Sequence, residues 1–347
     1  MRRLPIYFLV DISESMVGEP IEQVQEGIAT IVKELKKDPY SLETVYISVV
    51  AFAGEAEVIS PLQDIISFYP SKIPVGSGTS LSKGLSKVME CIDKDVVKTT
   101  YDRKGDWKPL VFLFTDGVPT DDATKAIERW NQYYHGKSNT IAVSVGDNTN
   151  YKLLGSLSDH VLLFNNSTEQ SYKEFFKWVT DSIKTTSQSV SETSKEGINL
   201  SKIDSIVLEK IDPTQEQRFP DNNFVVLSGK CSESKKLYLL KYKKALTSSG
   251  IEGMSTRYYR LDGAYKIDEN AYFRLSSQQK SNLRISVEEL QGNPSCPHCA
   301  NPIALATCSC GGIHCLQGEG HNTCPWCGTS DYYGFSNEGF DINRTLG

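Results

Sequence analysis

Short runs of almost entirely apolar residues recur along the N-terminal half of the chain. They cover residues 6–10, 45–52, 110–115, 140–145 and 161–164. Strands that are apolar on both faces are typical of a parallel sheet with helices packed on each side. The runs therefore predict a doubly wound, mostly parallel α/β sheet at this end of the chain.

Amphipathic stretches lie between these runs. Apolar residues recur at spacings of three and four from Ile21 to Leu35 and from Leu81 to Ile92, which predicts two helices that each bury one face. A third stretch with this spacing, from Tyr172 to Ile183, predicts the helix that closes the domain. We place the whole α/β domain at residues 1–188.

A hydroxyl-rich stretch, residues 189–202, follows this domain and is typical of a linker. Beyond it, short runs with strand composition alternate with turn sequences such as Asp262-Gly263. This pattern predicts a small β-rich domain over residues 203–292, followed by a cysteine-rich module and tail at 293–347. The runs that we expect to form strands cover residues 224–227, 237–242, 257–261 and 271–275.

Composition and charge argue against some classes of function, namely binding to nucleic acid and to membranes. The chain has 347 residues, of which 39% are hydrophobic and 23% are charged, values typical of a globular protein. Its net charge of -6 gives no overall positive field that would attract nucleic acid or an anionic membrane. No apolar run approaches the roughly 20 residues of a membrane-spanning helix. The N-terminal candidate, residues 4–10, is broken by Pro5, ended by Asp11 and followed by no cleavage site. We expect a cytoplasmic protein.

Polar loops follow two of the predicted strands, and a third precedes a predicted helix. The first strand leads into Asp11-Ile12-Ser13-Glu14-Ser15, and another is followed by Thr115-Asp116-Gly117. A glycine-rich loop at 76–80 carries Thr79 just before the helix that begins near Leu81. Taken singly, each loop is also explained as a helix cap or a turn. Together, at the carboxyl edge of a parallel sheet, their hard oxygen donors favour a site for Mg²⁺ or Mn²⁺.

These three motifs, in this order, resemble the metal-ion-dependent adhesion site of the von Willebrand factor A domain. The resemblance implies a Rossmann-like fold in which the hydroxyls of Ser13 and Ser15 bind Mg²⁺, and Thr79, Asp11 and Asp116 bind it directly or through water. It also implies that a Glu or Asp side chain of a partner protein completes the coordination. The pattern supplies no general base or nucleophile, so we expect no enzymatic activity. A Mg²⁺-dependent hydrolase is the weaker alternative, because two carboxylates among hydroxyls suit two-metal hydrolysis poorly.

The cysteines gather at the C-terminal end of the chain. Of nine, only Cys91 and Cys231 lie outside residues 296–327, and we interpret Cys231 as a packed thiol. In a cytoplasmic protein this clustering indicates metal binding rather than disulfides. The economical assignment is one zinc ion in a zinc-ribbon-like module, held by Cys296, Cys299, Cys324 and Cys327. The larger assignment adds a second zinc ion held by Cys308, Cys310, Cys315 and His321. The spacing leaves both assignments open.

The two ends of the chain together resemble the tellurite-resistance TerY-type proteins of bacteria, in which a von Willebrand factor A domain precedes a metal-binding tail. The resemblance implies an adaptor in stress response or phage defence, associated with a serine/threonine kinase and a PP2C-type phosphatase. An alternative hypothesis makes the zinc module a reader of nucleic acid or of another protein, with the first domain as its scaffold. The weak basicity of residues 296–327 argues against nucleic acid.

Overall fold

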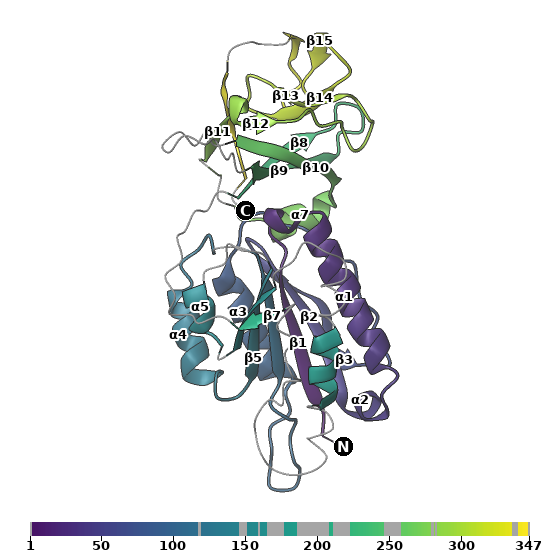
Figure 1. Ribbon diagram of the computed structural model, residues 1–347, viewed down its shortest axis with the longest axis vertical. Helices are drawn as coiled ribbons and strands as arrows, with labels where there is room; N and C mark the ends of the chain where they lie inside the picture. The colour runs from purple at the N-terminus through teal and green to yellow at the C-terminus, as the bar shows by residue number, and fades with distance from the viewer. Residues whose placement is uncertain are drawn as a thin grey trace. The chain divides into compact units, whose positions relative to one another are not determined.

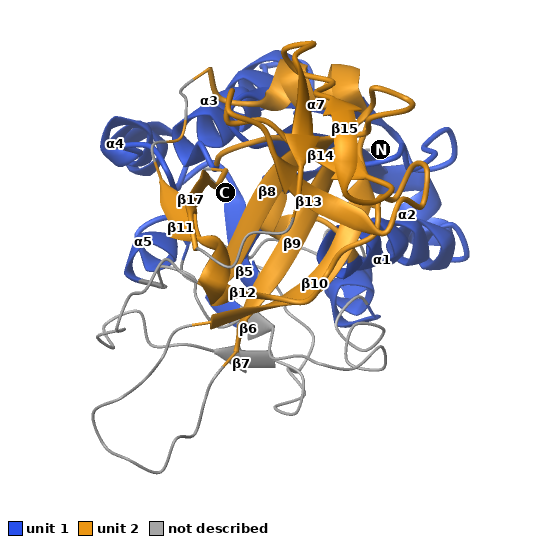
Figure 2. Ribbon diagram, turned by 90° about the horizontal axis from the view of Figure 1, so that it is seen from above, with its two compact units in different colours: residues 1–12, 19–73, 79–219 blue, residues 13–18, 74–78, 220–347 orange. Residues whose placement is uncertain are grey.

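The chain forms two compact units. The first comprises residues 1–12, 19–73 and 79–219, and the second comprises 13–18, 74–78 and 220–347 (Figure 2). Two short N-terminal segments therefore belong to the C-terminal unit. The computed structural model describes residues 2–116, 119–145, 151–158, 160–164, 177–185, 208–210, 223–245, 258–278, 281, 283–334 and 339–345.

The first unit is built on a seven-stranded sheet with the order β3-β2-β1-β4-β5-β6-β7. Its five central strands are parallel, and the two edge strands, β3 and β7, are antiparallel to their neighbours. The strands are β1 (Leu4–Asp11), β2 (Val45–Phe52), β3 (Ala56–Asp64), β4 (Leu110–Thr115), β5 (Asn139–Val145), β6 (His160–Phe164) and β7 (Leu208–Lys210).

The predicted α/β sheet is confirmed, and all five apolar runs form its parallel strands. Every residue of β1 and β4 is buried, as expected for strands covered on both faces. The edge strand β3 was not predicted, because its residues are mostly only partly buried and carry no regular alternation. Strand β7 falls within the segment expected to form the middle domain, yet it pairs with β6 in this sheet.

Helices cover both faces of this sheet (Figure 1). The buried apolar side chains of α1 and α3 recur at the predicted spacings. Of the expected closing helix, residues 171–176 lie outside the described residues, whereas 177–185 are helical. The helices of this unit are α1 (Glu19–Leu35), α2 (Pro39–Thr44), α3 (Leu81–Asp95), α4 (Thr124–Tyr133) and α5 (Tyr151–Gly155).

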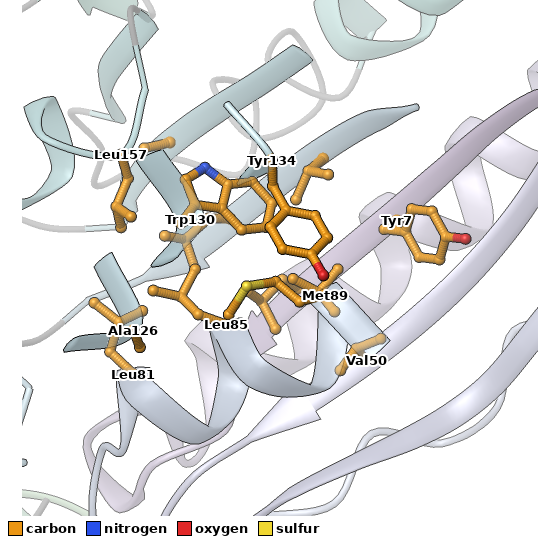
Figure 3. Close-up of a cluster of buried hydrophobic side chains, with 14 of the residues drawn as sticks. Tyr7, Val50, Leu81, Leu85, Met89, Ala126, Trp130, Tyr134 and Leu157 are labelled. Carbon is orange, nitrogen blue, oxygen red and sulfur yellow. The ribbon is translucent and has the colours of Figure 1, made fainter. Parts of the chain in front are cut away.

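A large aromatic side chain fills the space between α3, α4 and the sheet. Trp130 is fully buried, stacks on Tyr134 with ring centroids 5.7 Å apart, and packs with Leu85 and Met89 of α3 (Figure 3). Burial of this much apolar surface anchors both helices to the sheet. The loops that precede α3 and α4 are thereby held at the carboxyl edge of the strands.

The second unit is built on a six-stranded sheet with the order β12-β10-β9-β8-β14-β13. Strand β14, from the cysteine-rich segment, pairs in parallel with β8. Strands from the predicted β-rich domain and from the predicted cysteine-rich module therefore share one sheet. Its strands are β8 (Phe224–Lys230), β9 (Leu237–Ala245), β10 (Tyr258–Lys266), β12 (Leu290–Gln291), β13 (Ile303–Thr307) and β14 (Ile313–Leu316). The remaining elements are η1 (Glu14–Met16), α7 (Glu269–Leu275), β11 (Arg284–Ser286), η2 (Val287–Glu289), β15 (Gly320–Thr323), β16 (Ser330–Tyr333) and β17 (Asp341–Asn343).

One predicted strand of this unit is wrong: residues 271–275 lie in the helix α7. The side chain of Asp268 accepts a hydrogen bond of 3.0 Å from the backbone N–H of Ala271 and so caps the helix. Ala271, Tyr272 and Leu275 are buried, and their spacing places them on one face of a helix. In a run this short, strand composition did not reveal the cap that precedes it.

Candidate metal centres

Asp11 lies at the carboxyl end of β1 and is fully buried. The hydroxyl of Thr115, at the end of the neighbouring strand β4, donates a hydrogen bond of 2.7 Å to its carboxylate. Asp116 follows Thr115 directly, so the pairing of β1 with β4 brings both predicted acidic ligands to one edge of the sheet. Hydrogen bonding to a charged acceptor fixes the orientation of the Asp11 carboxylate.

Thr79 is 3% exposed and is held from both sides by Thr120. Its N–H donates to the Thr120 hydroxyl at 2.9 Å, and the N–H of Thr120 donates to its carbonyl at 2.9 Å. Asp121 accepts hydrogen bonds from the N–H groups of Leu81 and Ser82 and thereby caps α3. Sequence analysis missed these two supporting residues, because they lie about forty positions from the loop that they hold.

Ser13 and Ser15 belong to the second unit. Their hydroxyl oxygens are 3.0 Å apart, and Ser13 is fully buried. In an octahedral Mg²⁺ site with oxygens at 2.0–2.1 Å, adjacent ligands lie about 3.0 Å apart. The two hydroxyls therefore have the separation of neighbouring ligands of one such ion.

A first cysteine cluster brings together residues from distant parts of the second unit. The sulfur atoms of Cys231, Cys296, Cys299 and Cys315 all lie within 4.8 Å of one another. Cys231 follows β8 and Cys315 lies in β14, so the pairing of these strands brings the two thiols together. The N–H of Ser232 donates to the sulfur of Cys315 at 3.2 Å.

A second cluster contains Cys308, Cys310, Cys324 and Cys327. The sulfur atoms of Cys308 and Cys327 are 3.7 Å apart, and those of Cys310 and Cys324 are 3.8 Å apart. The N–H of Trp326 donates to the sulfur of Cys324 at 3.4 Å, while its indole N–H donates to the carbonyl of Ile313 at 2.7 Å. The tryptophan therefore ties this cluster to β14.

The sulfur separations fit tetrahedral zinc. With a Zn–S distance of 2.3 Å, the edge of the tetrahedron is about 3.8 Å. Three sulfur pairs are close to this value, at 3.6 Å between Cys299 and Cys315, 3.7 Å between Cys308 and Cys327, and 3.8 Å between Cys310 and Cys324, and all four sulfur atoms of each cluster lie within 4.8 Å of one another. Burial raises the pKa of Cys310 to about 12, whereas the backbone N–H of Cys310 lowers the pKa of Cys308 to about 6. Adjacent thiols therefore cannot all ionise unaided, and a dication removes this conflict by binding four thiolates.

This grouping differs from the economical assignment in the sequence. Cys296 and Cys299 lie in the first cluster, whereas Cys324 and Cys327 lie in the second. Cys231, interpreted from the sequence as a packed thiol, completes the first cluster; a lone cysteine 65 positions from the next one carries no spacing signal. His321 is outside both clusters: it is exposed, and its ring faces that of Tyr332. Of the residues proposed for a second ion, Cys315 joins the first cluster and Cys308 and Cys310 join the second.

Among the described residues, no helix has both the length and the apolar character needed to cross a membrane.

Comparison with known families divides the chain in two. A family model of the von Willebrand factor type A domain matches residues 6–178, and a family model of the TerY-C metal binding domain matches residues 221–347. The second match begins just before β8 and includes all eight cysteines of the two clusters. The metal-binding description of that family agrees with the geometry of the clusters.

Individual proteins resemble only part of the chain. The heavy chain 4 of the inter-alpha-trypsin inhibitor from Mus musculus is 24% identical over 165 residues, which are 44% of this chain and 17% of that protein. A von Willebrand factor type A structure from Catenulispora acidiphila is 17% identical, with a TM-score of 0.38, and the match covers 52% of this chain and 42% of that one. Proximal thread matrix protein 1 from the mussel byssus, solved with a zinc-occupied adhesion motif, is 20% identical with a TM-score of 0.36, covering 54% and 46%. The chain thus spans less than half of each of these proteins.

Proposed function

Because this chain joins a von Willebrand factor type A domain, residues 6–178, to a TerY-C metal binding domain, residues 221–347, we propose that it is a metal-dependent adaptor between proteins, of the TerY type, and not an enzyme. Von Willebrand factor A domains mediate protein–protein interactions. The observation that carries the proposal is the hydrogen bond from Thr115 to the buried carboxylate of Asp11, at the carboxyl edge of the sheet.

The proposed docking site holds Mg²⁺, or Mn²⁺, through five side chains. Carboxylates and hydroxyls are hard oxygen ligands, and Mg²⁺ keeps part of its water when few charged groups surround it. A water position on the ion can then be taken by the carboxylate of a partner protein. The five ligands that we propose are Asp11, Ser13, Ser15, Thr79 and Asp116.

The proposed role of the cysteine clusters is structural. Each cluster offers four thiols to one zinc ion, which leaves no open coordination position for a substrate. We infer two zinc ions, one in each cluster. Their binding free energy adds to the folding free energy of the C-terminal domain.

The partner that we propose presents an exposed Asp or Glu. In the bacterial cytoplasm, a serine/threonine kinase and a PP2C-type phosphatase of a tellurite-resistance, stress-response or phage-defence system are the candidates that the family resemblance suggests. The proposed site requires only a carboxylate from its partner. The adaptor therefore binds whichever of the two, kinase or phosphatase, displays an exposed Asp or Glu next to a complementary surface.

Affinity capture from the native host tests this function. In Mg²⁺, the wild-type chain should retain specific partners, and Asp116→Ala should retain them only at the level seen for the wild type in EDTA. Asp122→Ala is the matched control, because Asp122 is an exposed acidic residue nearby that accepts from the N–H of Thr124 and is not one of the proposed ligands. Equal recovery of the partners by Asp116→Ala and Asp122→Ala, in folded proteins, would contradict the docking role.

A further inference from the structure

Two short segments of the N-terminal domain are part of the core of the C-terminal unit. Residues 13–18 carry the two serines, and residues 74–78 carry the start of the glycine-rich loop. Val17 is buried against Val226 of β8, Leu239 of β9 and Tyr272 of α7, and Val75 packs on the same cluster. The C-terminal domain therefore provides the apolar contacts that hold the serine-bearing segment.

Between the two serines lies a buried carboxylate. Glu14 is 0% exposed, and a charge in this position is costly unless hydrogen-bond donors surround it. The hydroxyl of Tyr272 donates to one carboxylate oxygen, and the hydroxyl of Ser77 donates to the other at 3.0 Å. Burial and the adjacent carboxylate raise the pKa of Tyr272 well above its usual value, so the phenol stays protonated and remains a donor.

A buried lysine holds the end of the same segment. Lys241 of β9 is 1% exposed, and its ammonium group donates to the carbonyl of Val17 at 3.0 Å. The next residue, Gly18, has φ of +87°, and a Cβ there would lie 2.7 Å from the ring of Tyr265. Any other residue here would be strained by the positive φ and would have to displace that ring. The segment is therefore fixed at Glu14 and again at Val17 and Gly18.

The strands that hold this segment also carry the first cysteine cluster on their other face. Side chains alternate between the two faces of a strand. In β8 and β9, Val226 and Leu239 pack on the serine-bearing segment, whereas Leu227 and Leu240 pack in the core that contains Cys231, Cys296 and Cys315. A single layer of sheet thus separates the cysteines from the segment.

We propose that the C-terminal domain positions Ser13 and Ser15 for ion binding, with Tyr272 as the positioning residue. Zinc in the first cysteine cluster thereby strengthens ion binding at the proposed docking site, called the N-terminal site below. This inference rests on the proposed function, because it assigns the two serines to that site. If the sheet between the first cysteine cluster and residues 13–18 is disturbed, Val17 and Glu14 lose their contacts and the serines lose their fixed separation. Coupling of this kind is reciprocal: the N-terminal ion also strengthens zinc binding.

The role of Tyr272 is tested by titrating the full-length, zinc-loaded chain with Mn²⁺. Electron paramagnetic resonance measures the concentration of free Mn²⁺ at each step and so gives the affinity. Tyr272→Phe removes only the hydroxyl and should weaken Mn²⁺ binding about fivefold to tenfold, within the usual range of coupling between sites. Tyr332→Phe removes a hydroxyl from a tyrosine that is 62% exposed and should bind Mn²⁺ as the wild type does. Unchanged zinc content and circular dichroism would show that the Tyr272→Phe protein is folded.

A double-mutant cycle distinguishes positioning through Glu14 from general destabilisation. In a Glu14→Met background the phenol has no carboxylate to hold, so Tyr272→Phe should cause no further loss of Mn²⁺ affinity. A loss of the same size in both backgrounds would overturn positioning through Glu14. Equal affinity of the Tyr272→Phe and wild-type proteins would overturn the inference as a whole.

Two further variants separate this inference from the proposed function and test the coupling to zinc. Asp11→Ala should abolish Mn²⁺ binding; if it does not, the proposed docking site itself fails. Cys231→Ser, in the first cluster, should weaken Mn²⁺ binding. Cys327→Ser, in the second cluster, should lower the Mn²⁺ affinity less than Cys231→Ser does. Equal Mn²⁺ affinities for the wild type and Cys231→Ser would overturn the coupling.

Discussion

Individual buried side chains in this protein gain their roles from partners far away in the sequence. Cys231 is fully buried and isolated along the chain, yet its thiol lies among three others. Cys91 is also isolated and mostly buried, but among the described residues it belongs to no metal-ligating cluster. Burial raises the pKa of the Cys91 thiol to about 11, so it stays protonated near neutral pH and behaves as a small apolar group.

The contrast between these two cysteines gives a prediction at the scale of the residue. Cys231→Ser should lower the zinc content of the purified protein from two ions per chain to one, because a hydroxyl is a poor replacement for a thiolate ligand of zinc. Cys91→Ser, the matched control, should keep both ions. Atomic emission measurement of zinc per chain checks this, and two retained ions in Cys231→Ser would remove that residue from the ligand set.

At the scale of the element, helices begin where side chains from other segments satisfy their free N–H groups. The carboxylate of Asp121 accepts from the N–H groups of Leu81 and Ser82 and from the hydroxyl of Ser80. An acidic group at this end also interacts favourably with the helix dipole. Because Thr79 lies two residues before Leu81, the first residue of α3, the cap of this helix also restrains the proposed ligand.

Removal of this cap should have a measurable cost. Asp121→Ala should lower the free energy of unfolding by about 1–2 kcal/mol, the usual cost of losing a helix cap. Asp122→Ala should change it less, because Asp122 is exposed and accepts one helix N–H, that of Thr124, where Asp121 accepts two and the Ser80 hydroxyl. Urea unfolding of both variants measures the difference. Equal stabilities would mean that Asp121 does not stabilise the start of α3.

At the scale of the whole molecule, the two units are stabilised differently. The first packs helices on both faces of a sheet, and α3 and α4 lie together on one face around large apolar side chains, including Trp130 (Figure 3). In the second, the core contains Cys231, Cys296 and Cys315 themselves. Three of the proposed zinc ligands are therefore part of the packing of the second unit.

Zinc removal should consequently unfold one unit and spare the other. After extraction with a chelator and return to Mg²⁺, we expect proteases to cleave the chain within residues 223–334, while a fragment that contains residues 19–73 and 79–116 resists. Limited proteolysis with mass spectrometry identifies the cleavage sites. A zinc-free chain as resistant as the zinc-loaded one would show that the C-terminal domain folds without the metal.

The sequence by itself determined the features that depend on near neighbours along the chain. Apolar runs specified β1, β2, β4, β5 and β6, since residues buried on both faces of a strand leave no polar alternation. Spacings of three and four specified α1 and α3, since apolar residues at these spacings lie on one face of a helix and are buried together. The polar loops at the strand ends predicted both acidic residues, Asp11 and Asp116, at one edge of the sheet.

Only the tertiary structure decided which distant residues meet. The parallel pairing of β14 with β8 groups Cys315 with Cys231, and capping by Asp268 turns a strand-like run into α7. That helix in turn places Tyr272 on Glu14, 258 positions earlier in the chain. Such contacts depend on strand register and on the packing of elements far apart in sequence, which the local alternation of polar and apolar residues does not encode.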